Sequence, residues 1–141
     1  MATFVKVEGL DRLNKVLQSL PPKLQRRPLQ RALASGGVAF ARQVRANARR
    51  LDDKSTPKAI YKAVTNRISP TRTRKNGGSP VQRVMIRPTA ANPVYHWNLL
   101  EYGTSKMAAR PFMRPAYDQA QGEATTRAAK TLEKELLRAV K

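Results

Sequence analysis

Apolar residues recur at helical spacing in three parts of the chain. In the segment VEGLDRLNKVLQSLP this spacing predicts a first helix, which ends at Pro21-Pro22. A second helix is expected to start near Pro28, because proline is favoured in a first turn, and to run through LQRALASGGVAFARQVRANARRL. The last helix is expected over PAYDQAQGEATTRAAKTLEKELLRAVK, where Pro115 suits the first turn and Asp118 suits the positive end.

Each predicted helix carries an apolar stripe that can face a core. Gly36-Gly37 interrupts the second helix, and each glycine costs about 1 kcal/mol of helix stability relative to alanine. The pair therefore indicates either close approach of another backbone or a bend. The stripes consist of Leu10, Leu13, Val16, Leu17 and Leu20 in the first helix, Leu29, Leu33, Phe40 and Val44 in the second, and Leu132, Leu136, Leu137 and Val140 in the last.

The middle of the chain changes to an alternating pattern that is typical of strands. The segments AIYKAVTNRIS and PVQRVMIRPT are both interpreted as strands, which pair as a hairpin. Their connection, PTRTRKNGGSP, is too long for a tight turn and too polar to be buried, so residues 70–80 are expected to form a mobile, exposed arm. The predicted fold class is α+β: two N-terminal helices, a central antiparallel hairpin with a long basic loop, and a C-terminal helix.

Composition limits the kind of protein that this can be. A chain of 141 residues with 40% hydrophobic residues corresponds to one domain with a modest core. The absence of cysteine excludes disulfides, thiolate chemistry and cysteine-based zinc sites. The N-terminal pattern contains Lys6 and Glu8, unlike a signal peptide, and no run approaches the roughly 20 apolar residues that span a bilayer. We therefore expect a protein made in the cytoplasm, with no membrane partner.

Positive charge is concentrated in the middle of the chain. The 28 Lys and Arg residues exceed the 9 Asp and Glu residues by 19, and residues 23–87 alone hold 17 basic and 2 acidic side chains. Such a field attracts polyanions, of which nucleic acid is the most obvious. Solubility alone is the weaker explanation, because both ends of the chain are close to balanced.

The sequence offers little that could support catalysis. A single histidine, His96, cannot build a histidine metal cluster or a catalytic triad, and a structural or interface role is expected for it. Ser55-Thr56-Pro57-Lys58 matches a Ser-x-x-Lys pattern by chance, with a proline where the chemistry needs a helix. Capping or local charge balance explains Asp52-Asp53, and Gly77-Gly78 lacks the residues of a phosphate loop. We expect no enzyme, cofactor or metal site.

The segment WNLLEYGTSKMAARPFMRPAYD is the most specific part of the sequence. It contains Glu-Tyr-Gly-Thr at 101–104, a polar spacer, and Pro-Phe-Met-Arg-Pro-Ala at 111–116. This pattern resembles the motif of a family of head–tail connector proteins of long-tailed bacteriophages, also called neck, tail-completion or tail-component proteins. The segments VEGLDRLNKVLQSLP and LQRALASGGVAFARQVRANA resemble the first two helices of that family, whereas the central hairpin resembles it least.

The residues themselves suggest what the motif does. Gly103 can take a positive φ and reverse the chain, while Pro111 and Pro115 restrict the residues before them to extended conformations. Phe112 then becomes an apolar plug beside the last helix, and Glu101 with Arg114 is a candidate ion pair across the turn. The residues with an expected structural role are Trp97, Glu101, Tyr102, Gly103, Thr104, Pro111, Phe112, Arg114 and Pro115.

The resemblance implies a structural protein of the virion that carries out no reaction. It would form a ring, expected to be sixfold, around the DNA channel at the head–tail junction, after synthesis in the host bacterial cytoplasm. Its partners would be its own copies, adjacent head-completion or adaptor proteins, tail-terminator or tail-tube proteins, and non-specifically bound double-stranded DNA. Subunit or partner contacts are expected for Lys106, Met107 and Arg110 and for Arg42, Arg45 and Arg49; DNA or partner contacts are equally expected for Arg72, Arg74 and Lys75.

A free-standing basic nucleic-acid-binding protein is the competing hypothesis. It explains the charge but not the motif at 101–116, and the chain lacks the interleaved surface aromatics that stack on bases. Portal, capsid and tail genes beside the gene would decide for the connector.

Overall fold

The computed structural model describes residues 9–55 and 57–139. They form an α+β structure, as the sequence predicts. Along the chain, the two strands of the antiparallel sheet come after the N-terminal helices and before the C-terminal helix. No helix in these two ranges is long and apolar enough to cross a membrane. In chain order the elements are α1 (Leu10–Ser19), α2 (Pro22–Leu51), the 3-10 helix η1 (Ile60–Ala63), β1 (Val64–Ile68), α3 (Pro70–Lys75), β2 (Gln82–Ile86), α4 (Trp97–Tyr102) and α5 (Met113–Ala139).

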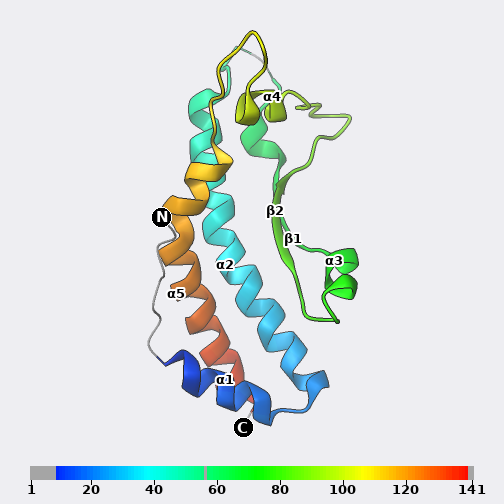
Figure 1. The fold of residues 1–141 in the computed structure, drawn as a ribbon, viewed down its shortest axis with the longest axis vertical. Helices are drawn as coiled ribbons and strands as arrows, with labels where there is room; N and C mark the ends of the chain where they lie inside the picture. Colours follow the sequence, from blue (N-terminus) through cyan, green and yellow to red (C-terminus); the bar gives the residue numbers. More distant parts are fainter. Residues whose placement is uncertain (1–8, 56, 140–141) are drawn as a thin grey trace.

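Two long antiparallel helices, α2 and α5, form the scaffold (Figure 1). Small side chains line their contact: Ala116, Ala120 and Ala124 recur every fourth residue on α5 and are buried. A Cβ added at Gly36 of α2 would lie 3.0 Å from the carbonyl oxygen of Ala124. Close approach of another backbone therefore explains Gly36, which was one of the two explanations predicted for the glycine pair.

Polar contacts hold the two helices in register along their exposed edges. Arg31 and Arg42 of α2 form salt bridges with Glu135 and Glu123 of α5. Between these two ion pairs, the hydroxyl of Thr131 donates a hydrogen bond to that of Ser35, at 3.0 Å. Exposed ion pairs contribute less than about 1 kcal/mol each to folding stability. Their main effect is therefore on how the two helices are aligned.

The hairpin packs on the side of α2 that is away from α5 (Figure 1). Its strands pair antiparallel, with Val64 opposite Ile86 and Arg67 opposite Arg83. Val64 and Ile86 are buried toward α2, whereas Arg67 and Arg83 are exposed on the outer face. An isolated two-stranded sheet is at best marginally stable in water, so this one depends on its apolar contact with α2.

The core lies where α2, the hairpin and the start of α5 meet. Phe112, Ile60 and Val94 are fully buried there. Alanines of α2 and α5 surround them, and Leu136 is the only leucine among the described residues that is fully buried. Most of the buried hydrophobic residues are alanines, so the helices and the sheet can approach closely.

The second helix starts earlier than predicted. It begins at Pro22, and Pro28 lies inside it and is buried. Pro22 takes the first helical position, where its missing N–H costs nothing, so the pair that ends α1 also starts α2. Pro28 is the seventh residue of a helix of 30 residues, so the hydrogen bond that it cannot donate is missing close to the helix start.

The middle region also departs from the prediction in two places. The first strand was expected over 59–69, but Ile60–Ala63 forms a 3-10 helix and only Val64–Ile68 is a strand. The basic connection was expected to be a mobile, exposed loop, but Pro70–Lys75 forms the helix α3. The Ser69 hydroxyl caps α3, and buried Thr73 accepts a hydrogen bond from the N–H of Val81 at 3.1 Å, which ties α3 to the hairpin.

The predicted stripe of the last helix is only partly correct. Leu136 is buried, but Leu137 is 63% exposed, and Val140 lies outside the described residues. The buried positions of α5 are mainly alanines, which the leucine-based pattern misses. In α2, Val44 is buried, whereas Leu29, Leu33 and Phe40 are half-buried.

The close contact at Gly36 gives a stability prediction. We expect Gly36→Val to lower the free energy of unfolding by about 1–3 kcal/mol, because the added atoms push α5 away from α2. Gly122 is the control, since a Cβ there meets nothing within 4 Å. Gly122→Ala should therefore raise stability by about 0.5–1 kcal/mol through helix propensity. Urea unfolding of both variants tests this, and equal effects of the two substitutions would contradict the close-contact explanation.

Candidate functional site

A buried carboxylate organises the motif at 101–116. Glu101 lies near the end of α4, and its side chain is only 3% exposed. Its two oxygens accept hydrogen bonds from the backbone N–H groups of Phe112, Met113 and Arg114, at 2.8, 3.0 and 3.2 Å. These three groups form the N-terminus of α5, so Glu101 caps that helix from another element.

This cap satisfies the whole helix end. The first four N–H groups of an α-helix have no partner within the helix, and leaving them buried and unpaired is costly. Three of them bond to Glu101, and the next residue, Pro115, has no N–H to satisfy. The negative charge also lies at the positive end of the helix dipole. The spacing of the glutamate, the phenylalanine and the second proline therefore has a single physical explanation.

Gly103 makes the geometry possible. Its φ of 74° and ψ of −179° lie in a region that is essentially restricted to glycine. The positive φ predicted from the sequence is therefore confirmed. A Cβ at this position would also lie 2.7 Å from the nitrogen of Ala109 and 2.9 Å from the carbonyl oxygen of Met107. No other residue fits without moving the loop that follows.

That loop, residues 104–110, projects from one end of the molecule (Figure 1). The N–H of Thr104 donates to the carbonyl of Met107 at 2.8 Å, and the N–H of Arg110 donates to the carbonyl of Leu100 at 2.7 Å. These bonds give the loop a defined shape, while its side chains are exposed. Lys106 also lies here, so the structure brings the three predicted spacer contacts together on one projection.

The aromatic residues of the motif divide between core and surface. Phe112 is 1% exposed and packs in the core as the predicted plug, and Trp97 packs against the same core while partly exposed. The carbonyl of Phe112 accepts a hydrogen bond from the amide of buried Asn47 on α2, at 3.1 Å. This bond connects the capped start of α5 to the opposite helix.

The predicted ion pair of the motif is present but peripheral. The Arg114 Nε lies 3.9 Å from a Glu101 oxygen, and the Arg114 side chain is 69% exposed. Its guanidinium lies over the ring of Tyr102, 5.1 Å from the ring centre. The charge of Glu101 is thus held mainly by backbone N–H groups, a role that sequence spacing alone did not indicate.

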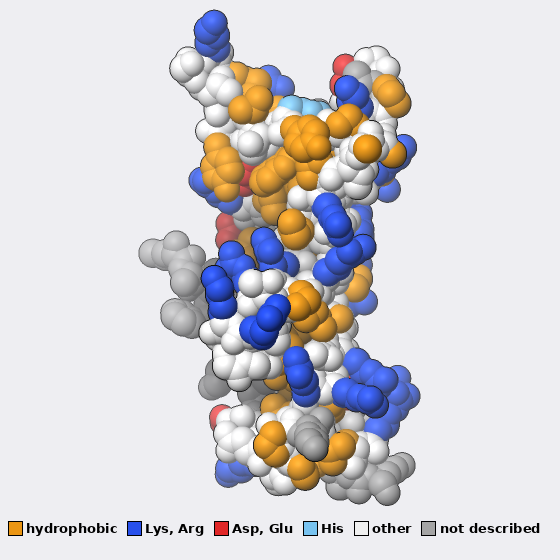
Figure 2. Space-filling view, turned by 90° about the vertical axis from the view of Figure 1, so that its right-hand side faces the viewer, with side chains coloured by type: hydrophobic (Ala, Val, Ile, Leu, Met, Phe, Trp, Pro, Cys, Tyr) orange, Lys and Arg blue, Asp and Glu red, His pale blue; other side chains and the backbone are white. Residues whose placement is uncertain are grey.

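Exposed apolar side chains gather beside the projecting loop. Leu99 and Tyr102 are 47% and 64% exposed, and their spacing places them on one side of α4. Tyr95, in the turn just before α4, is 68% exposed. Met107 on the loop is 37% exposed. We call these four residues the α4 patch, and Figure 2 shows hydrophobic side chains at this end of the molecule. Sequence analysis did not select Tyr95 or Leu99, because their exposure depends on how α4 docks.

The arginines predicted on one face of α2 have partners within the chain. Arg42 pairs with Glu123 of α5. Arg45 donates to the carbonyl of Val64 at 2.9 Å, and the Arg49 guanidinium lies 4.7 Å from the centre of the Tyr61 ring. These contacts join α2 to its neighbours on both sides, and the predicted contacts of the three residues with subunits or partners stay a prediction.

The basic residues of the predicted arm are exposed. Arg72, Arg74 and Lys75 lie on α3, outside the hairpin. Figure 2 shows the face on which α3 and the hairpin lie, and Lys and Arg side chains are spread over it. The structure therefore places these residues on a basic surface, away from the projecting loop.

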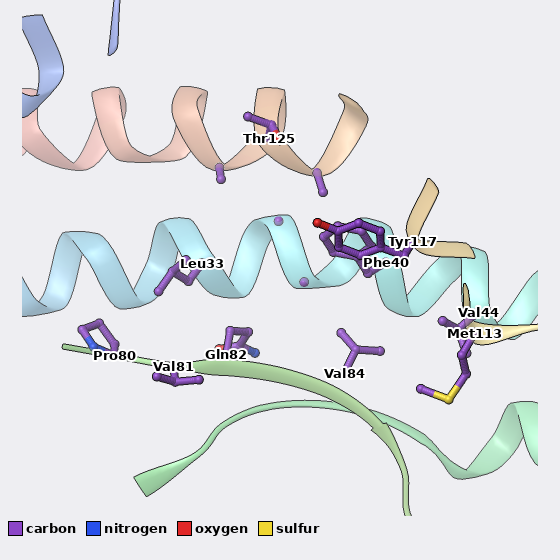
Figure 3. Close-up of a pocket in the computed structure, with 14 residues that line it drawn as sticks. Leu33, Phe40, Val44, Pro80, Val81, Gln82, Val84, Met113, Tyr117 and Thr125 are labelled. Carbon is purple, nitrogen blue, oxygen red and sulfur yellow. The ribbon is translucent and has the colours of Figure 1, made fainter. Parts of the chain in front are cut away.

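An apolar groove runs along α2 between α5 and β2 (Figure 3). Its volume is about 700 Å³. The ring of Phe40 stacks on that of Tyr117 at one side, with 5.4 Å between their centres, and Val81 and Val84 of the hairpin segment line the other. The lining is almost entirely apolar, and the Tyr117 hydroxyl is the one titratable group among the described residues that form it.

The remaining titratable groups of interest have structural roles. Within 9–55 and 57–139 no cluster of three potential metal ligands occurs. The carboxylate of Asp52 accepts hydrogen bonds from the N–H groups of Ile60 and Tyr61, and so caps η1. The backbone N–H and the hydroxyl of Ser55 bond to Asp53 and hold its pKa below the usual value. Capping was one of the two roles predicted for this acidic pair, and Asp52 has it.

Comparison with known proteins identifies no relative: no protein-family model, curated protein or solved structure matches this chain.

The cap at α5 gives a second prediction. We expect Glu101→Gln to lower the free energy of unfolding by about 1–3 kcal/mol, because the neutral amide offers one acceptor oxygen and no charge to the three N–H groups. Glu133→Gln on the exposed face of α5 is the control and should change stability by less than about 0.5 kcal/mol. Thermal and urea unfolding measure both. Equal stability of the Glu101 variant and the unmodified protein would show that the cap is dispensable.

The turn gives a third prediction. We expect Gly103→Val to destabilise the fold by at least about 1–3 kcal/mol, because a β-branched residue is strained at positive φ and its Cβ meets the loop backbone. Gly77 also has positive φ, at 61°, but a Cβ there meets nothing within 4 Å. Gly77→Val therefore separates backbone strain from the clash: its loss of stability should be the smaller of the two in thermal melting.

Proposed function

We propose that this chain is a non-enzymatic structural subunit of the head–tail junction of a long-tailed bacteriophage. It assembles into a ring, expected to be sixfold, around the DNA channel and joins the head connector to the tail. The proposal rests on the motif at 101–116, whose geometry is suited to a role in assembly. Glu101 fixes a projecting loop at one end of the molecule, beside the exposed α4 patch.

This arrangement suits contact between subunits. The loop offers a polar and cationic tip, with Lys106 and Arg110, and the α4 patch offers apolar surface next to it. Protein interfaces commonly combine an aromatic, apolar centre with a charged rim, and arginine and tyrosine are enriched in them. The ring partners are further copies of the chain, and the adjacent rings of the head and tail are its other partners in the virion.

The competing function is a free-standing nucleic-acid-binding protein. The basic surface formed by α3 and the hairpin favours this function. Nucleic-acid binding gives no reason, however, for the projecting loop and the exposed α4 patch at the end of the molecule. A connector needs both surfaces, since it contacts proteins around a channel that contains DNA.

A charge reversal on the loop tests the proposal. Arg110→Glu should change stability by less than about 1 kcal/mol, because the side chain is exposed, but it should prevent assembly, since like-charge contacts at an interface cost several kcal/mol. Complementation of a phage that lacks the gene, with electron microscopy, is the measurement. Unjoined heads and tails from a folded variant are the expected result.

The matched control is Arg12→Glu on α1, an exposed arginine at the opposite end of the molecule (Figure 1). It changes the net charge equally and should leave virions normal. Normal virions from Arg110→Glu would remove the loop from the interface. Failure of complementation by both variants would point to net charge instead of a specific contact.

A further inference from the structure

One face of the molecule carries positive charge that its own carboxylates do not neutralise. Residues 64–87, which hold the hairpin and α3, contain 6 Lys and Arg residues and no Asp or Glu. The salt bridges found among the described residues use arginines of α2 and α5. None of them involves Arg67, Arg83 or Arg87 of the hairpin, or Arg72, Arg74 or Lys75 of α3. The carboxylates in these salt bridges thus pair with arginines of α2 and α5, and the cationic side chains of the hairpin and α3 are in none of them.

The register of the hairpin brings two of these charges directly together. Arg67 and Arg83 are cross-strand partners, and both are exposed on the face that points away from α2. Like charges directly opposite one another destabilise a sheet. This pair therefore costs stability in the isolated chain, and an external anion placed between the two guanidinium groups would remove that cost.

Helix α3 extends the same surface. Between α3 and β2 lies an open hollow of about 750 Å³, lined by Arg72, Lys75 and Arg83 together with Ser69, Thr71, Asn76 and Val81. Its charged groups are all cationic, and hydroxyl and amide groups lie among them as further hydrogen-bond donors. This is the composition of a surface that contacts a chain of phosphates.

We propose that the outer face of the hairpin and α3, formed by Arg67, Arg72, Lys75, Arg83 and Arg87, binds the phosphate backbone of double-stranded DNA without sequence preference. We call it the hairpin face. Residues 64–87 contain no aromatic side chain, so the face lacks the stacking groups with which proteins hold unpaired bases. The backbone of a duplex is the ligand that charge alone can hold. This proposal specifies the DNA contact of the proposed connector.

Binding of a polyanion by a protein of net charge +19 is not informative by itself, so the test compares two double variants of equal charge. Arg67→Gln/Arg83→Gln removes the facing pair. Arg127→Gln/Arg138→Gln removes two arginines of α5 that are in salt bridges with Glu123 and Glu135. Fluorescence anisotropy with a duplex of about 20 base pairs, over a series of salt concentrations, gives the affinity and its salt dependence.

We expect the hairpin variant to bind at least on the order of tenfold more weakly at 0.1 M salt, and its slope of log K against log salt to be smaller by about two. Its melting temperature should be equal to or higher than that of the unmodified protein, because the repulsion between the two arginines is gone. The α5 variant should keep most of the affinity. Two duplexes of unrelated sequence should bind equally well.

Equal losses of affinity in the two double variants would overturn the proposal, since binding would then follow net charge alone. Displacement of the duplex by poly-glutamate at equal charge concentration would also overturn it, and would indicate an acidic protein surface as the ligand. These outcomes are independent of the complementation test with Arg110→Glu, which measures whether the projecting loop is needed to join heads and tails.

Discussion

The bond between the Glu101 carboxylate and the start of α5 is the interaction on which the projecting end of this protein depends. One buried side chain satisfies three N–H groups, fixes α4 against α5, and sets the direction in which the intervening chain leaves the fold. Removing a cap of this kind leaves buried donors unpaired, which costs more than the net gain of an ordinary hydrogen bond. The core contact of Phe112 and its bond to Asn47 then carry this order into α2.

The scaffold and the surface use charge in opposite ways. Along α2 and α5, arginines are matched with glutamates, and the helices approach closely through alanine and glycine. On the hairpin and α3, arginines are collected without carboxylates, even where the register sets two of them opposite one another. A fold that matched every charge would be more stable but would present no cationic face. The paired charges of α2 and α5 thus belong to the scaffold, and the proposed DNA contact depends on the cationic side chains of the hairpin and α3.

Much of the fold could be predicted because it depends on local patterns. Apolar spacing located α1, most of α2, the hairpin and α5, and the glycine and prolines of the motif indicated the turn at Gly103. Tertiary contacts determined the rest. Helix α3 needs the cap of Ser69 and the bond from Val81 to Thr73, which no pattern shows. For Glu101 the sequence predicts only the ion pair with Arg114, because a charge of opposite sign is visible in a sequence and backbone N–H groups are not.

The Glu101 cap also separates positions that can vary in evolution from positions that cannot. Loop residues 104–110 leave and re-enter the fold at points held by backbone bonds, by Gly103 and by the Glu101 cap. Substitutions at Ser105, Lys106, Ala108 or Arg110 touch nothing in the interior, so the tip can diverge rapidly while the scaffold is preserved. A lineage could therefore adapt to a changed neighbouring protein by altering a few tip residues. The frame around the tip, by contrast, would accept almost no change.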